Sequence, residues 1–187
     1  MPRYNDCLDI WETWTSPNIP AIPPEAALTG QCGRNGGLAE AGNPAEILLV
    51  EDRTSDVELM KEALQECHSC HHLHVVRNGE EALAFLYRQG KYERAPRPHL
   101  ILLDLNLPRL SGHEVLAAIK ADPILKLLPV VVLTTSTTAQ DILQSYELHA
   151  NCCITKPADI DQFIEVVQVT LNFWLSFVSL PLATDNY

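Results

Sequence analysis

An apolar run that ends on a single carboxylate is the feature that most constrains the fold of this chain. Leu100–Leu103 is entirely apolar, Asp104 follows it, and the loop beyond contains Pro108. A short apolar run bounded by turn residues is typical of a strand buried on both faces. In parallel α/β sheets, ligands bind at the carboxyl ends of the strands. Asp104 is therefore the first candidate for a functional residue.

Strand and helix patterns alternate along the chain beyond this run as well. Five strands are predicted, from the apolar runs at 46–50, 73–76, 100–104, 129–133 and 152–155. Each is followed by a segment with helical periodicity, and several are apolar throughout, which is typical of a parallel sheet covered by helices on both faces. Because crossovers are right-handed, few topologies remain. The pattern favours an α/β, flavodoxin-like doubly wound sheet of five parallel strands in the order 2-1-3-4-5.

Capping residues mark the predicted helix starts. Ser55 with Glu58, and Ser111 with Glu114, form the sequence pattern of a capping box. Asn78 is a further cap candidate, and a helix is expected to open at Thr138.

Three regions differ in composition. Residues 1–44 contain six of the 13 prolines and five of the eight glycines, without a sustained period of 2 or 3.6. Such a segment buries too little apolar surface to offset its ordering entropy, so we expect a disordered extension. Residues 45–174 are predicted to form the folded domain, and residues 175–187 a C-terminal tail. The length of 187 residues agrees with this division, because it is enough for one domain with a substantial core.

The charge of the chain excludes several kinds of partner. The net charge is −11, and there is no run of Lys or Arg, so nucleic-acid binding would lack its main electrostatic contribution. No apolar run approaches the roughly 20 residues of a membrane span. The first residues lack the apolar segment of a signal peptide. We therefore expect a cytoplasmic protein that binds neither nucleic acid nor membrane, with its six cysteines reduced.

Polar residues follow four of the predicted strands. Glu51 and Asp52 follow the first, Asp104 ends the third, Thr134 the fourth and Lys156 the fifth. Carboxyl ends of parallel strands meet at one edge of a sheet, and three carboxylates packed together do not all stay ionised without a cation. Oxygen ligands of this kind suit Mg²⁺, while a lysine and a hydroxyl attract an anion. This combination indicates phosphoryl chemistry at a carboxylate.

Four motifs at these strand ends resemble, in order, those of the receiver domain of two-component response regulators. They are ILLVED at 47–52, LILLDLNLP at 100–108 with Gly112, VVLTT at 131–135 and ITKP at 154–157. The resemblance covers about residues 45–174. Longer stretches, such as RNGEEALAFL at 77–86 and SYELHANCCITKP at 145–157, further resemble the small single-domain regulators paired with cyanobacterial phytochromes.

The resemblance implies a role for each of these residues. Asp104 would accept a phosphoryl group from the phosphohistidine of a sensor histidine kinase, for which a phytochrome is a candidate. Thr134 would hydrogen-bond the phosphoryl group, and Lys156 would pair with its oxygens or with Asp104. Mg²⁺ would be held by Glu51, Asp52, Asp104 and Asn106. The bond between Lys156 and Pro157 would be cis, and the chain would be a phosphoacceptor rather than a dedicated enzyme.

Two positions depart from the family pattern. Receivers usually have Tyr or Phe three residues before the lysine, where this chain has Cys153, so signalling through an aromatic rotamer is in doubt. The residue after Thr134 is usually small, and here Thr135 is expected to crowd the phosphoryl group. Because only 13 residues follow Trp174, we expect the output to be protein–protein contact.

Two other function classes remain as alternatives. A receiver-like scaffold that takes no phosphoryl group would fit Cys153, although the acids, Thr134 and Lys156 argue against it. A phosphatase of the haloacid dehalogenase type also uses an aspartyl phosphate. That family requires a second Asp two residues after the nucleophile, where this chain has Asn106.

The last predicted helix, from about Asp159 to Trp174, has two apolar faces. One stripe contains Ile160, Phe163, Ile164, Val167, Leu171 and Trp174, and the other contains Val166, Val169, Phe173 and Phe177. A helix with two apolar faces buries both. The second face predicts a homodimer through this helix, and the alternative is that residues 174–182 fold back over the domain.

Residues 67–74 carry two cysteines and three histidines, Cys67, Cys70, His71, His72 and His74. These are zinc-ligand types, but a second cysteine pair at suitable spacing is missing, because Cys152 and Cys153 are adjacent. Cys67 is equally explained as a core-facing helix residue. Both interpretations stay open.

Overall fold

The computed structural model describes residues 44–65 and 71–181. The predictions for residues 1–43, Cys67, Cys70 and residues 182–187 lie outside these ranges. The strands are β1 (Ala45–Val50), β2 (His71–Val76), β3 (Leu100–Asp104), β4 (Val130–Thr134) and β5 (Cys152–Thr155). The α-helices are α1 (Thr54–Gln65), α2 (Gly79–Leu86), α3 (Gly112–Ala121), α4 (Ala139–Glu147) and α5 (Ile160–Asn172). Shorter helical turns are η2 (Gly90–Tyr92), η3 (Leu125–Leu127) and the π-helical η4 (Phe173–Phe177).

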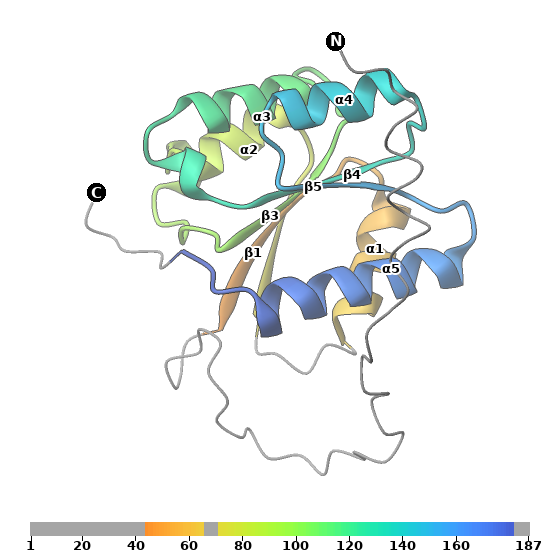
Figure 1. Cartoon of the computed structure of the whole chain (residues 1–187). Helices are drawn as coiled ribbons and strands as arrows, with labels where there is room; N and C mark the ends of the chain where they lie inside the picture. Colours follow the sequence, from red (N-terminus) through yellow and green to blue (C-terminus); the bar gives the residue numbers. More distant parts are fainter. Residues whose placement is uncertain (1–43, 66–70, 182–187) are drawn as a thin grey trace. The chain divides into compact units, whose positions relative to one another are not determined.

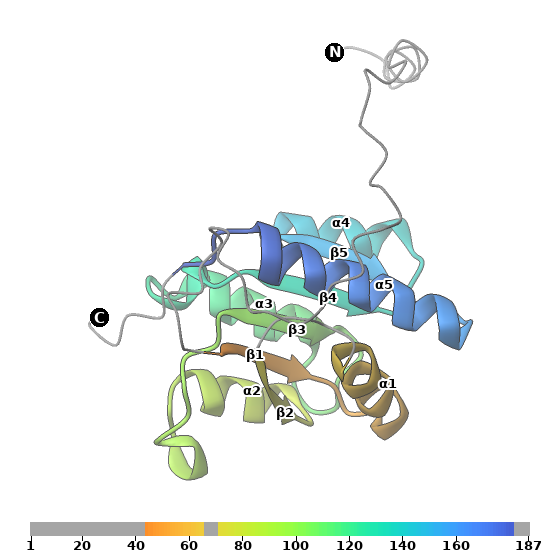
Figure 2. The same cartoon turned by 90° about the horizontal axis from the view of Figure 1, so that it is seen from below.

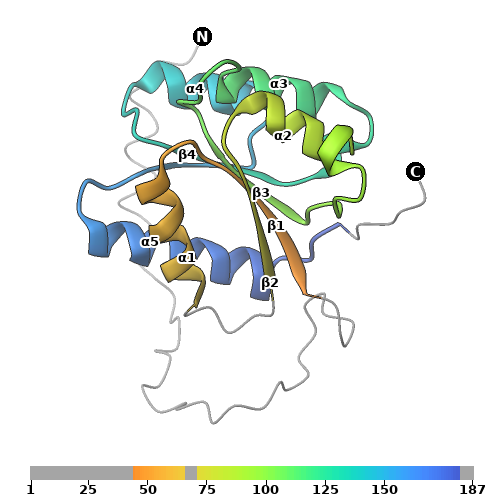
Figure 3. The same ribbon diagram turned by 180° about the vertical axis from the view of Figure 1, so that it is seen from behind.

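The five strands form one parallel sheet in the order β2-β1-β3-β4-β5, which confirms the predicted topology. Helices α1 and α5 cover one face of the sheet, and α2, α3 and α4 cover the other (Figures 1 and 3). The view from below, onto the side of α1 and α5, shows the strands side by side from β2 to β5 (Figure 2). Asp104 pairs with Leu133, and Thr134 pairs with Thr155, so the strands end at a common edge.

Both faces of the sheet are packed, which explains why the inner strands are apolar throughout. Successive strand side chains point to opposite faces, so Leu48 and Val50 lie in the cluster under α2 and α3, whereas Ile47 and Leu49 lie in the cluster under α1 and α5. Every residue of β3 and β4 is buried. The edge strands β2 and β5 are only partly buried, as the polar His74 of β2 indicates.

The capping predictions were mostly right. Ser111 and Glu114 form a capping box, and Asn78 and Thr138 accept the backbone N–H groups of Glu81 and Asp141. The prediction for Ser55 was wrong, because α1 begins one residue earlier, at Thr54. The carbonyl of Arg53 already accepts the N–H of Val57 at 3.2 Å, and the Ser55 hydroxyl donates to Asp56 instead.

The C-terminal helix keeps its two apolar faces, except that Ile160, which was expected on the inner one, is 59% exposed. Phe163, Val167 and Leu171 of α5 are buried against the sheet. Val169, Phe173 and Phe177 are 64%, 53% and 78% exposed. In the part of the chain that the structure describes, no helix is both long and apolar enough to span a membrane.

Candidate functional site

Buried polar side chains gather where the strands end. Within residues 44–65 and 71–181, five polar or charged side chains are buried, and four of them follow or end a strand at this edge: Glu51, Asp104, Thr134 and Lys156. Buried polar groups are costly unless they are paired. Here no buried side-chain N or O atom of the described residues lacks a partner. The sequence therefore places charge at this edge at an energetic cost, which is typical of a functional site.

Lys156 is the centre of this arrangement. Its Nζ lies 3.1 Å from Asp104 Oδ2, 2.5 Å from Glu51 Oε2 and 2.9 Å from Asp56 Oδ2. One ammonium group is thus shared by three carboxylates. The predicted contact with Asp104 is present, and the site also contains Asp56, which the sequence analysis missed. The first turn of a helix that follows a strand lies at the same edge, and that position was the available signal.

The excess of carboxylates perturbs the titration of the site. Burial lowers the pKa of Lys156, but Asp104 and Glu51 outweigh burial, so the pKa is raised and the ammonium stays charged. Burial raises the pKa of Glu51, and Lys156 offsets this only in part. For Asp56, burial also raises the pKa, but the hydrogen bond and the charge of Lys156, together with Ser55 and Arg53, outweigh it, and the pKa is lowered. Charge at the site is therefore unbalanced towards the acids, and a further cation would relieve the imbalance.

Three of the acids have the spacing of a divalent-metal site. Glu51, Asp52 and Asp104 each offer an oxygen, and these oxygens lie within 4.8 Å of one another. This is the one group of three or more His, Cys, Asp or Glu with such spacing among the described residues. The histidines of β2 therefore form no zinc cluster with other described residues. Asp52 is exposed while the other two are buried, so the cluster opens to solvent. Hard oxygen ligands around an open position suit a divalent cation that keeps several waters.

The backbone after Asp104 is fixed by two contacts. The N–H of Asn106 donates to Asp104 Oδ1 at 3.2 Å, and the amide of Asn106 donates to Thr135 Oγ1, also at 3.2 Å. Gly112 begins α3 directly against β3. A Cβ at this position would lie 2.2 Å from the carbonyl oxygen of Asp104, so only glycine allows this approach.

Thr134 is fully buried, and its hydroxyl is engaged within its own loop. Thr134 Oγ1 accepts the N–H of Ser136 at 3.0 Å. The hydroxyls of Ser136 and Thr138 both donate to Asp141 Oδ2 in the first turn of α4, at 2.8 Å in the case of Thr138. The loop after β4 is thus tied to α4 through one carboxylate.

The position three residues before the lysine contains a small polar network. Cys153 is half-buried, and burial raises the pKa of its thiol, although a hydrogen bond with Ser145 opposes this. Ser145 is fully buried. Its hydroxyl donates to the carbonyl of Asp141 at 2.8 Å and lies 3.3 Å from His113 Nε2. Hydrogen-bonded side chains from α3, α4 and β5 therefore occupy the region where receiver domains usually have an aromatic ring.

The expectation of a cis bond before Pro157 was wrong, because the structure has no cis peptide bond among its described residues. The trans isomer is intrinsically favoured by about 0.5–1 kcal/mol. The N–H of Lys156 donates to the carbonyl of Thr134 at 2.7 Å, and Nζ reaches Asp104.

Comparisons with known proteins agree with this geometry. A family model described as the response regulator receiver domain matches residues 47–168. Response regulator Rcp1 of Synechocystis sp. is 51% identical over 144 residues, which are 77% of this chain and 98% of Rcp1. A probable methanogenesis regulatory protein, FilR2 of Methanothrix harundinacea, is 36% identical over 148 residues, or 79% of this chain and 94% of FilR2.

Solved structures show the same relationship. The phosphorylated cyanobacterial phytochrome response regulator RcpA is 50% identical with a TM-score of 0.72, and the match covers 74% of this chain and 99% of RcpA. The Mn²⁺-bound form of Rcp1 is 51% identical, also with a TM-score of 0.72 and with the same coverage.

Proposed function

Because the chain belongs to the response regulator receiver family, we propose that it accepts a phosphoryl group on Asp104 from the phosphohistidine of a sensor histidine kinase. The observation that carries this proposal is the buried Asp104 carboxylate, held 3.1 Å from the buried ammonium of Lys156 beside an open acidic cluster. In this step an Asp104 oxygen forms a bond to phosphorus, the phosphorus–nitrogen bond breaks, and the imidazole leaves with a proton. Little covalent chemistry is asked of the protein, so positioning and charge neutralisation dominate.

Each polar residue at the edge has a part in this proposal. Lys156 would neutralise the phosphoryl oxygens as they approach Asp104. Mg²⁺ would be held by Glu51, Asp52, Asp104 and the carbonyl of Asn106, and when bound it would supply further positive charge to the transferring group. Asp56 lies outside the acidic cluster, so it can keep hold of Lys156 when Glu51 and Asp104 turn towards the cation.

Thr134 would report the phosphoryl group to α4. Its hydroxyl now accepts the N–H of Ser136, so turning it towards a phosphoryl oxygen would release that N–H. Ser136 in turn donates to Asp141 at the start of α4. We infer that phosphorylation changes the surface of α4 through this loop and through the hydrogen bonds of Ser145. No aromatic ring is needed at the position of Cys153.

The alternatives are less well supported. A haloacid dehalogenase type of phosphatase would need an acid at Asn106, whose amide instead donates to Thr135. A scaffold that takes no phosphoryl group would not require Glu51, Asp104, Thr134 and Lys156 to be buried together. We therefore propose a phosphoacceptor that is not a dedicated enzyme.

A phytochrome-type kinase in the cytoplasm is the proposed partner. RcpA, which is 50% identical, is described as a cyanobacterial phytochrome response regulator. We also propose a homodimer through the C-terminal helix, because Val169, Phe173 and Phe177 form an apolar stripe that stays more than half exposed. Burying such a stripe against a second copy across a two-fold axis would remove it from water.

One experiment tests the phosphorylation and the dimer together. The protein is incubated with Mg²⁺ and acetyl phosphate, and its intact mass and molar mass in solution are measured. The wild type should gain the mass of one phosphoryl group and Asp104→Asn should gain none, whereas phosphorylation of both proteins would refute the assignment. Phe177→Ser should shift the protein towards monomer. Leu127→Ser, at a residue that is 59% exposed outside the stripe, is the matched control and should leave the molar mass unchanged.

A further inference from the structure

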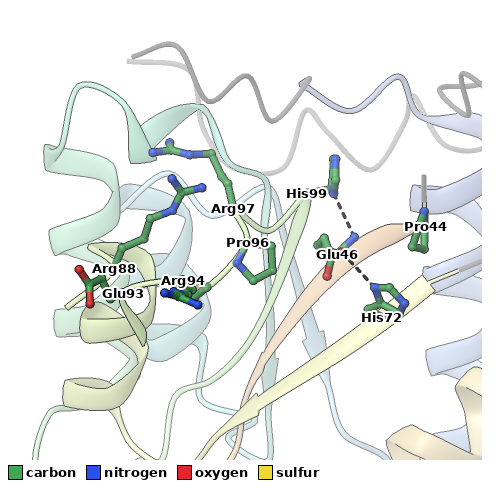
Figure 4. Close-up of a pocket in the computed structure, with 10 residues that line it drawn as sticks. Pro44, Glu46, His72, Arg88, Glu93, Arg94, Pro96, Arg97 and His99 are labelled. Atoms are coloured by element: carbon green, nitrogen blue, oxygen red, sulfur yellow. Dashed lines mark hydrogen bonds and ion pairs between the residues drawn. The ribbon is translucent and has the colours of Figure 1, made fainter. Parts of the chain in front are cut away.

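A second polar site lies at the opposite end of the strands from Asp104. A pocket of about 560 Å³ is lined by Pro44 and Glu46 at the start of β1, His72 at the start of β2 and His99 just before β3. Its other side is formed by the segment 88–97. Figure 4 shows Arg88, Arg94 and Arg97 on that side, with Pro96 between them and His99.

The segment 88–97 is basic in an acidic protein. It contains Arg88, Lys91, Arg94 and Arg97, which are four of the 13 Lys and Arg of the chain, and one acid, Glu93. Lys91 is paired with Glu81 at 2.8 Å. Arg94 and Arg97 make no side-chain ion pair or hydrogen bond, as judged over residues 44–65 and 71–181, although Arg97 is half-buried. Two guanidinium groups that pair with no acid of the described residues therefore line the pocket.

The carboxylate of Glu46 is directed away from these arginines. Its two oxygens contact His72 Nδ1 at 3.0 Å and His74 Nε2 at 2.5 Å. Burial raises the pKa of Glu46, but these hydrogen bonds outweigh burial, and the pKa is lowered, so the group stays ionised while engaged with β2. The acid is thus held by the histidines.

His99 adds a donor on the far side of the pocket. Its Nδ1 lies 3.0 Å from the backbone N of Glu46 and accepts that N–H. The neutral imidazole therefore carries its proton on Nε2, which points away from Glu46 (Figure 4). Together with the two guanidinium groups, the pocket presents donors to whatever enters it. Ala95, Pro96 and Pro44 add apolar surface between them.

We propose that this pocket binds a small molecule that carries phosphate groups and has an apolar or planar body, in the size range of a nucleotide. Guanidinium groups match phosphate oxygens in a two-pronged geometry, and the volume lies within the roughly 300–1,000 Å³ of small-molecule sites. The phosphates lie against Arg94 and Arg97, and the body lies against the proline and alanine surface. This site is separate from the phosphorylation of Asp104.

Three probes separate the parts of this ligand. Pyrophosphate supplies the phosphates, adenosine the body, and ADP both. Binding to the full-length protein is followed by titration calorimetry and amide chemical shifts, with EDTA present so that no metal recruits phosphate to the acidic cluster. The variants are Arg94→Gln, at an exposed position that is expected to fold normally, and Arg97→Gln. The matched control is Lys61→Gln, which removes one exposed cation from α1.

ADP should bind saturably and shift the amides of residues 88–99, more tightly than pyrophosphate, and adenosine should bind least. Each arginine substitution should weaken ADP binding about tenfold or more, as expected for the loss of a charged hydrogen bond, while Lys61→Gln should not change it. Absence of saturable binding, equal weakening by Lys61→Gln, or shifts confined to the surroundings of Asp104 would overturn the proposal.

Discussion

The ammonium nitrogen of Lys156 lies 3.1 Å from Asp104 Oδ2, and the two side chains are only 4% and 3% exposed. Glu51 and Asp56 share the same ammonium, so one cation holds three acids that would otherwise repel one another. Removing one partner of a buried ion pair leaves a buried charge without compensation. This arrangement makes the stability of the fold and the chemistry of the site depend on the same few atoms.

Replacing Lys156 with Met should therefore destabilise the protein by about 3 kcal/mol. Mg²⁺ should recover part of this loss, because a bound cation replaces the missing charge. Chemical denaturation with and without Mg²⁺ measures both effects. Lys120→Met is the matched control, since Lys120 is half-buried but donates only to the carbonyls of Lys126 and Leu128 and to Asn151. Equal recovery by Mg²⁺ in both variants would contradict the explanation.

Asp56→Asn should slow phosphorylation without removing metal binding. Asp56 contacts Lys156 at 2.9 Å but lies outside the cluster of Glu51, Asp52 and Asp104. Losing this charged hydrogen bond should cost about 1.5 kcal/mol of unfolding free energy and leave Lys156 less well positioned. The affinity for Mg²⁺ should stay close to that of the wild type. Glu58→Gln, at the exposed acid that pairs with Lys61, is the control and should change neither the phosphorylation rate nor the affinity for Mg²⁺. A large loss of Mg²⁺ affinity in Asp56→Asn would place Asp56 among the ligands instead.

Asp141→Asn should leave phosphorylation unchanged but weaken the response of α4 to it. Asp141 accepts the hydroxyls of Ser136 and Thr138, and so ties the loop after Thr134 to α4. The variant should be phosphorylated to the same extent as the wild type. Hydrogen exchange in α4 should already be faster before phosphorylation and should change less upon it. Glu147→Gln, an exposed acid on the same helix, serves as the control, and an undiminished response of α4 in Asp141→Asn would show that the signal takes another route.

Acidification should weaken the fold in part through His99. Burial lowers the pKa of His99 below its usual 6.5, so the unfolded chain takes up this proton at a higher pH than the folded one. The unfolding free energy should therefore fall as the pH drops below about 6.5, until the folded imidazole also protonates. Glu46, whose pKa is lowered, loses its contribution only at more acidic pH. His99→Gln should flatten the first decline, whereas His149→Asn, at an exposed position that tolerates Asn, should keep it. An equal slope in all three proteins would contradict this assignment.

The sheet and most of the site followed from local patterns. The apolar runs ending at Val50, Asp104 and Thr134 fixed the strands within a residue or two, because both faces of the sheet are packed and the ends share one edge. Asp56 was missed because it lies in the first turn of α1 and not at a strand end, although that turn meets the same edge of the sheet. The early start of α1 depends on one backbone hydrogen bond, from the N–H of Val57 to the carbonyl of Arg53. Neither such a bond nor the isomer of the bond before Pro157 leaves a periodic signal in the sequence.

The most direct test of the central assignment is to identify the residue that carries the phosphoryl group. Protein phosphorylated by acetyl phosphate in the presence of Mg²⁺ is reduced with borohydride, which converts an aspartyl phosphate to homoserine, and peptides are sequenced by mass spectrometry. The account predicts homoserine at position 104 and at no other acid of the cluster, with none in Asp104→Asn. Homoserine at Asp52, the longer alcohol 5-hydroxynorvaline at Glu51, or an unmodified Asp104 in protein that has taken up phosphate, would contradict it.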